Sequence, residues 1–161
     1  MKSLTRSIFL LMFLVFAFSC SDDDNPSTTE NGPEAISGSV SWEVNNTDIN
    51  HTIAVQLKIN PTFDGESLSN GDKIGVFCKV DNDYVCAGFS VWTGSENIAV
   101  TAWGDDSQTT EKDGFSANET FVWRIQRAAD QKNYAASVEY ESGPENFIAN
   151  GITVLKTLKV E

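Results

Sequence analysis

The chain has 161 residues, of which 23 are acidic and 11 basic, and its formal net charge is −12 at pH 7. A chain of this length, with 40% hydrophobic residues, can form one globular domain and is too short for two. The negative charge excludes sequence-independent binding to nucleic acid, which requires clustered Lys and Arg. One histidine and three cysteines leave few of the side chains that are commonest in metal and acid–base sites.

Residues 1–19 are predicted to be a cleaved export signal. Lys2 and Arg6 form a short basic segment, and an unbroken apolar run over residues 8–18 follows them. This order is typical of secretory signals. The run is too short for a transmembrane helix, which needs about 20 apolar residues.

The signal ends in the segment Phe16-Ala17-Phe18-Ser19-Cys20. This segment resembles the lipobox of bacterial lipoproteins. The resemblance implies cleavage before Cys20 and acylation of that cysteine, and several acyl chains would hold the protein on a membrane. The alternative is an ordinary secretory signal followed by an incidental cysteine.

The next four residues, Ser21, Asp22, Asp23 and Asp24, resemble the acidic tag that sends lipoproteins of Bacteroidota to the outer face of the outer membrane. The alternative is a solvated charge run in a linker. Residues 20–37 are polar and lack apolar periodicity, so we expect a flexible tether. The predicted location is therefore the outer membrane, with the lipid on Cys20 as anchor and the domain facing the cell exterior.

From residue 38 onward, apolar residues alternate with polar ones, as in strands with one buried face. The clearest run is 52–59, in which Ile53, Val55, Leu57 and Ile59 share one face. No segment has the apolar spacing of an amphipathic helix. Seven further strands are expected around residues 40–44, 74–80, 85–91, 98–102, 121–125, 134–140 and 152–160.

Eight short strands in residues 38–161 predict an all-β fold, an antiparallel two-sheet β-sandwich of the jelly-roll kind. A closed barrel is the competing architecture. Trp42 and Trp123 are in phase with the apolar residues of their strands, so we expect both in the core.

A series of short segments runs through this domain: NHTIAV (50–55), GDKIGVF (71–77), CAGFSVWTG (86–94), TAWGDD (101–106), TEKDGF (110–115), FVW (121–123) and NGI (150–152). In this order they resemble a β-sandwich module of secreted and surface proteins of Bacteroidota. The resemblance covers nearly the whole domain and supports a surface location. It implies no activity and no catalytic residues.

The hairpin that joins strands 74–80 and 85–91 decides whether Cys78 and Cys86 can form a disulfide. A three-residue turn, 81–83, would place the two cysteines opposite each other. A two-residue turn at Asn82 and Asp83 would separate them and give a better core. The second register is favoured, with two unpaired thiols, although a β-bulge could restore the pairing.

Three aromatic residues are candidates for contact with a ligand or partner. Trp92 and Trp103 are out of phase with the apolar residues of their strands. With Tyr84 they are expected to form an aromatic strip on the outer face of a sheet, on which sugar rings or a protein could stack. The alternative is that a loop or the second sheet covers them.

The loop 105–114 concentrates carboxylates and hydroxyls, the oxygen ligands that Ca²⁺ prefers. Asp105, Asp106 and Asp113 are the candidate ligands. The loop does not fit the twelve-residue calcium template, and Lys112 adds a positive charge. A solvated acidic loop is therefore favoured over a calcium site, and no other cofactor is expected.

His51 is the only candidate for histidine-dependent catalysis, and it is in phase with Ile53 and Val55, which favours a histidine at the edge of the core. An acidic pair could also support glycoside hydrolysis, but no pair stands out. We therefore expect a non-enzymatic protein. The favoured function is a binding module for an extracellular ligand, a glycan in particular. The alternative is an accessory subunit that docks onto an outer-membrane protein complex.

Overall fold

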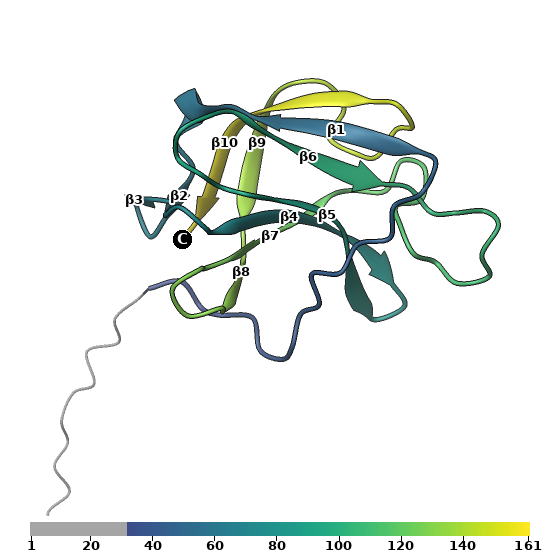
Figure 1. The fold of residues 1–161 in the computed structure, drawn as a ribbon, viewed down its shortest axis with the longest axis horizontal. Coiled ribbons are helices and arrows are strands. Elements are labelled where there is room, and N and C mark those ends of the chain that lie inside the picture. The colour runs from purple at the N-terminus through teal and green to yellow at the C-terminus, as the bar shows by residue number, and fades with distance from the viewer. Residues whose placement is uncertain (1–31) are drawn as a thin grey trace, which may run out of the picture. The chain divides into compact units, whose positions relative to one another are not determined.

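The computed structural model describes residues 32–161, so the predicted signal peptide, Cys20 and the tag Ser21, Asp22, Asp23 and Asp24 lie outside the described residues. Residues 32–161 form ten β-strands in two sheets and one short 3-10 helix (Figure 1). This confirms the predicted all-β sandwich. None of these residues belongs to a helix long and apolar enough to cross a membrane.

The larger sheet is built around β10 (Ile152–Val160). One edge of β10 pairs antiparallel with β9 (Ser137–Ser142). The other edge pairs in parallel with β1 (Asn50–Val55) over its first residues and with β2 (Thr62–Phe63) over its last two. The 3-10 helix η1 (Leu57–Ile59) connects β1 to β2. The sheet continues through β6 (Ile98–Trp103) beyond β1 and through β3 (Glu66–Ser67) beyond β2.

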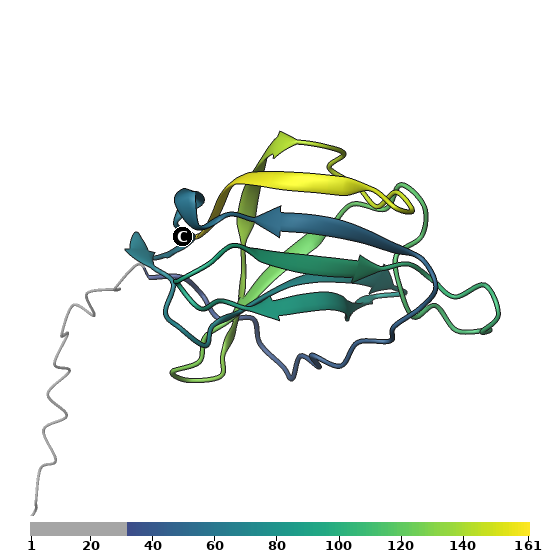
Figure 2. The same cartoon turned by 45° about the horizontal axis from the view of Figure 1, so that its top comes forward.

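The smaller sheet has four antiparallel strands in the order β5 (Asp83–Val91), β4 (Lys73–Val80), β7 (Val122–Gln126) and β8 (Asn133–Ala135). Figure 2 shows β10, β1 and β6 side by side, with the four-stranded sheet packed below them. The parallel pairs of β10 are a departure from the expected wholly antiparallel sandwich. They are possible because β10 is far from β1 and β2 in the chain, so no hairpin fixes their direction.

The core lies between the two sheets and is filled by alternate residues of the facing strands. The inward positions of β1, β4, β6 and β7 are almost fully buried, as period-two alternation predicts. Trp123 is in this core, as expected, with an exposed fraction of 4%. Other members are Ile53, Val55, Ile74, Val76, Cys78, Val100, Ala102, Phe115, Ile125, Phe147, Leu155 and Leu158.

Residues 40–44 are not a strand, and Trp42 is not in the core. These residues belong to a segment, 35–44, that we call the strap. It begins at the β8 edge, where Ala35 pairs with Tyr134 and the Ile36 N–H donates to the Asn133 carbonyl at 2.7 Å. It then crosses the outer face of the four-stranded sheet, where Trp42 is half-buried. The domain's backbone pairing thus starts at residue 35, inside the segment predicted as tether.

Two other predicted strands are interrupted. The run 52–59 is a strand only to Val55, after which η1 turns the chain and leaves Leu57 exposed. The run 134–140 divides at Ala136 into β8 and β9, which belong to different sheets. In both places the apolar alternation continues through a change of direction, so periodicity alone does not reveal the break.

The β4–β5 hairpin adopts neither of the two expected turns, so the favoured register, with Asn82 and Asp83 as the turn, is wrong. Its turn is Asp81–Asn82, with Asp81 at φ 53°, and Cys78 pairs with Val85. A bulge at Ala87 then shifts the pairing, so that the far half follows the register of a three-residue turn. Cys86 lies opposite Phe77, and the two cysteines face opposite sides of the hairpin. Both are free thiols, which confirms the prediction of two unpaired thiols.

Candidate functional site

The outer face of the four-stranded sheet carries an aromatic and cationic surface. The register places Gly75 of β4 between Phe89 of β5 and Arg124 of β7. Phe77 and Tyr84 lie on the same face, because side chains two residues apart on a strand point the same way. The four strands contain one acidic residue, Asp83 at the start of β5, although the chain as a whole carries a net charge of −12.

Arg124 lies between two aromatic rings. Its guanidinium carbon is 4.7 Å from the ring centre of Phe77 and 5.0 Å from that of Tyr84. Cation–π contacts of this kind hold the guanidinium near the rings without using its N–H donors. Burial holds the pKa of Arg124 below its ordinary value, yet an arginine remains charged at all physiological pH values.

Trp42 of the strap covers the neighbouring part of this face. Its indole ring meets Phe77 and Phe89 edge-on, at centroid distances of 5.2 and 5.6 Å, and its Nε1–H donates to Asn133 Oδ1 at 2.8 Å. The Lys73 ammonium lies 5.6 Å from the indole centre. These contacts fix the strap on the sheet and so define one wall of a pocket.

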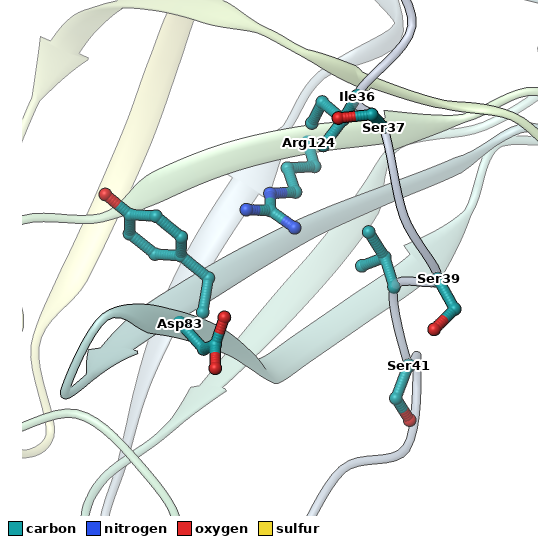
Figure 3. Close-up of a pocket in the computed structure, with 8 residues that line it drawn as sticks. Ile36, Ser37, Ser39, Ser41, Asp83 and Arg124 are labelled. Carbon is teal, nitrogen blue, oxygen red and sulfur yellow. The ribbon is translucent and has the colours of Figure 1, made fainter.

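The pocket lies between the strap and the sheet and has a volume of about 380 Å³. Figure 3 shows the Arg124 guanidinium pointing into the space between the strap and the end of β5. Tyr84 is 41% exposed and presents its ring at the pocket's edge. The remaining lining residues are Ile36, Ser37, Ser39, Val40, Ser41 and Asp83. The pocket lining therefore includes one partly exposed aromatic ring, a guanidinium, a carboxylate and three serine residues.

The expected strip of Tyr84, Trp92 and Trp103 does not form. Trp92 is 2% exposed and belongs to the core, because the bulge at Ala87 reverses the phase of the last part of β5 and turns Trp92 inward. Trp103 is half-buried on β6, which belongs to the other sheet. Only Tyr84 of the three lies at the pocket.

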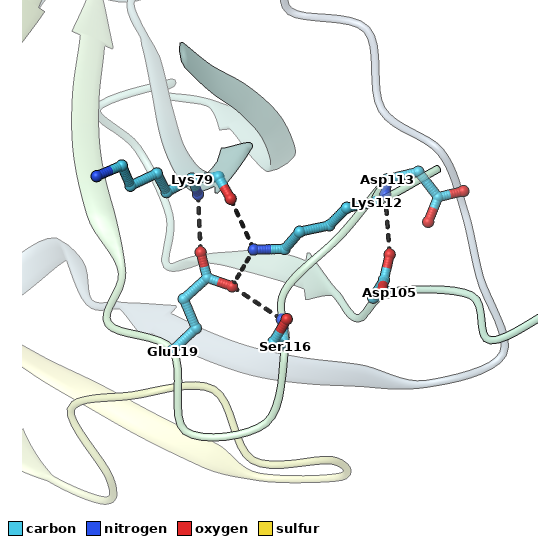
Figure 4. Close-up of polar contacts among 6 residues, drawn as sticks. All are labelled: Lys79, Asp105, Lys112, Asp113, Ser116 and Glu119. Atoms are coloured by element: carbon cyan, nitrogen blue, oxygen red, sulfur yellow. Dashed lines mark hydrogen bonds and ion pairs between the residues drawn. The ribbon is translucent and has the colours of Figure 1, made fainter. Parts of the chain in front are cut away.

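The acidic loop does not gather its carboxylates around one point. Asp105 Oδ1 accepts the Asp113 N–H at 2.9 Å (Figure 4), and Asp113 Oδ1 accepts the Asp106 N–H at 3.1 Å. Asp106 in turn accepts the N–H of Gln108. Residues 32–161 contain no group of three or more His, Cys, Asp or Glu side chains arranged to hold a metal ion. These carboxylates stabilise the loop's backbone, and calcium binding there stays a prediction.

Lys112 points away from the three aspartates. Its ammonium pairs with Glu119 at 2.6 Å and donates to the Lys79 carbonyl at 2.7 Å (Figure 4). Glu119 also accepts the N–H groups of Lys79 and Ser116. Burial raises the pKa of Glu119, but these donors outweigh it and hold the pKa below its ordinary value. The loop is thereby attached to the end of β4.

His51 is fully buried at the start of β1. The Ile148 N–H donates to Nδ1 at 3.2 Å, and Nε2 lies 2.9 Å from Thr153 Oγ1, whose hydroxyl donates to the Pro144 carbonyl. Nε2 carries a proton, because the Thr153 hydroxyl already donates to Pro144, and Nδ1 lies near both the Ile148 N–H and, at 3.1 Å, the Ile148 carbonyl. Burial lowers the pKa of His51, against a smaller opposing effect of the Ile148 backbone. The predicted histidine of the core is confirmed.

Arg124 and the strap were not predicted from the sequence as site residues. Arg124 alternates with the core residues Trp123 and Ile125, which signals an outward-facing cation, but the sequence does not reveal that Phe77 and Tyr84 flank it. No family model matches the chain, and neither a curated protein nor a solved structure shows significant similarity to it.

Proposed function

We propose that this protein is a cell-surface lipoprotein of the outer membrane whose domain binds extracellular carbohydrate without transforming it. The location is supported by the lipobox-like residues up to Cys20 and by the acidic residues Asp22, Asp23 and Asp24. The ligand class is supported by the pocket on the four-stranded sheet.

The observation that carries the proposal is the chemistry of the pocket lining. A sugar ring offers a face of C–H groups, which stacks on an aromatic ring, and a rim of hydroxyls, which needs both donors and acceptors. Tyr84 supplies the exposed ring, Arg124 the donors and Asp83 the acceptor, and serine hydroxyls of the strap do both. A volume of about 380 Å³ lies within the range of about 300–1,000 Å³ typical of small-molecule sites.

A non-catalytic role is supported by the position of the single histidine. His51 has no exposed surface, and its ring nitrogens are occupied by Ile148 and Thr153, so it is not available to a bound ligand. The pocket itself contains one carboxylate, Asp83, whereas glycoside hydrolysis ordinarily uses two.

The test is a glycan array probed with the purified full-length chain, followed by calorimetric titration of each hit. Tyr84→Ala should weaken binding by about tenfold or more, and Tyr84→Phe, which keeps the ring, by much less. Leu57→Ala is the matched control, because Leu57 is similarly exposed but lies on η1, away from the pocket. Absence of glycan binding, or binding that Tyr84→Ala does not alter, would refute the proposal.

A second candidate, docking onto an outer-membrane protein, is favoured by the outer face of the six-stranded sheet. Trp103 and Ile152 lie on this face, and Ile152 is 68% exposed. The test is recovery of the intact lipoprotein from membranes extracted in mild detergent. An equimolar membrane partner that Ile152→Asp releases and Tyr84→Ala retains would favour docking over glycan binding.

A further inference from the structure

Arg124 is the one basic residue that lines the pocket, and its guanidinium forms no ion pair or hydrogen bond with the described residues. Residues 32–161 contain two arginines, and Arg127 pairs with the buried Asp72 at 3.2 Å. Arg124 has neither an acidic partner nor a hydrogen-bond acceptor among the described residues; its contacts are the rings of Phe77 and Tyr84. A partly buried guanidinium with five N–H donors and no acceptor is unusual, because such groups are ordinarily paired.

The rings on either side also orient Arg124. Because Arg124 contacts the rings of both Phe77 and Tyr84, the guanidinium loses little further freedom when it binds a ligand. Its planar fork matches a carboxylate, which it binds through two parallel hydrogen bonds. The Ser37 and Ser39 hydroxyls on the opposite wall remain for the rest of the ligand.

The charge of the surrounding face favours an anion. Lys73, Lys79 and Arg124 all face outward on this side of the sheet, and they outnumber Asp83, the one acidic residue of these strands. Asp83 is the one carboxylate of the pocket lining, and it is an exposed residue beside the hairpin turn, next to Tyr84. Positive charge is therefore concentrated on this face of a chain whose net charge is −12, and it attracts a negatively charged ligand.

We propose that the pocket selects acidic carbohydrate, in which a ring carboxylate of the uronic-acid type binds Arg124 while the sugar ring stacks on Tyr84. This inference rests on the proposed carbohydrate-binding function and specifies its ligand class. Arg124 acts as the specificity-determining residue.

The experiment uses pairs of oligosaccharides that differ only in charge. Oligogalacturonate, oligomannuronate and hyaluronan fragments are each compared with their carboxyl-reduced forms, in which every carboxylate has become a neutral hydroxymethyl group. Titration of the full-length chain should show at least about tenfold tighter binding to the acidic member of one pair, and the preference should shrink as NaCl is raised.

Variants assign the effect to one residue. Arg124→Gln should abolish the preference for the acidic member, and Arg124→Lys should keep part of it, because charge remains but the fork is lost. Lys132→Gln is the control, since it makes the same charge change on the β7–β8 connection, outside the pocket. The wild-type comparison stands even if Arg124→Gln does not fold.

The outcomes separate the two proposals. Equal binding of the acidic and reduced members of a pair would overturn the acidic-sugar inference and leave carbohydrate binding intact. An acidic preference that survives Arg124→Gln would also overturn the assignment to Arg124. If the array and every pair give no binding, the proposed function fails, and this inference fails with it.

Discussion

Trp42 lies directly over the backbone of Gly75, so closely that a Cβ built on Gly75 would be 2.5 Å from the indole Cζ3. The strap therefore rests on the one position of β4 that has no side chain. We predict that Gly75→Ala displaces the indole and lowers the free energy of unfolding by about 1–3 kcal/mol, the range for overpacking. Urea denaturation followed by tryptophan fluorescence measures this.

The same substitution tests whether the strap forms the pocket wall. Gly75→Ala should weaken glycan binding, because the strap carries Ser37 and Ser39. In a Trp42→Ala background the added methyl group has no ring to displace, so it should change stability little further. Strictly additive effects of the two substitutions would show that Gly75 is needed for another reason.

The strap also marks a limit of sequence analysis. The alternation of Val40, Trp42 and Val44 is genuine, but it reflects a segment with one side on a sheet's outer face, not a strand facing the core. Alternation of apolar and polar residues shows that one side of an extended segment is buried, but it does not show whether the core or the outer face of a sheet buries it. The all-β class and the core positions of β1, β6 and β7 follow from the pattern because one face of each of these strands is buried and the other is more exposed. In β4 the outward Phe77 is buried as well.

The candidate site could be predicted only in part. The alternation along strand β5 correctly predicts that Tyr84 faces outward, but it wrongly predicts the same for Trp92, because the bulge at Ala87 lies between the two residues. A bulge adds one residue to one strand, so every later side chain of that strand points to the opposite face. No residue preference in the sequence around Ala87 predicts the bulge. The place of Arg124 between two rings depends on cross-strand register, which a single sequence does not contain.

His51 should make the stability of the protein depend on pH near neutrality. Its pKa is lowered from 6.5 in the folded state by burial, so the unfolded chain binds more protons in the interval below 6.5. The free energy of unfolding should be steady above that value and fall as the pH drops through it. Because His51 is the only histidine, His51→Gln should remove this slope, at a cost of about 1–3 kcal/mol from the lost contacts.

Urea titrations at half-unit intervals from pH 5 to pH 8 measure the effect. A wild-type curve that is flat down to pH 5, or a slope that His51→Gln retains, would contradict the assignment. Carboxylate titration contributes mainly at lower pH, and Glu119, whose pKa is held below its ordinary value, does not titrate in this interval.

Glu119 should stabilise the acidic loop far more than a surface ion pair would. Its side chain is 17% exposed and accepts from Lys112, Lys79 and Ser116. Glu119→Ala leaves these donors without their acceptor, and we expect a loss of about 2–4 kcal/mol and faster hydrogen exchange at the Lys79 and Ser116 amides. Glu141→Ala is the control.

Glu141 pairs with Lys58 at 3.2 Å, but both side chains are about half exposed or more, at 46% and 62%. Such pairs contribute about 0–1 kcal/mol. Similar losses in the two variants, or unchanged exchange at Lys79, would show that the Glu119 contacts do not hold the loop.

Cys78 and Cys86 should be inert thiols in the folded protein. Burial raises the pKa of each to about 11, with smaller effects from Lys112 on Cys78 and from the Gly88 carbonyl on Cys86. At pH 8 only about one thiol in a thousand is then a thiolate, the form that reacts. Their positions on opposite faces of the β4–β5 hairpin also prevent them from forming a disulfide with each other without a change of register.

We therefore expect both to resist alkylation under native conditions and to react promptly in urea. Peptide mapping after iodoacetamide treatment, with and without prior reduction, distinguishes the two sites. A peptide pair linked through Cys78 and Cys86 would show that the hairpin adopts the three-residue turn in solution. Rapid native labelling of either thiol would show that it is not protected by burial.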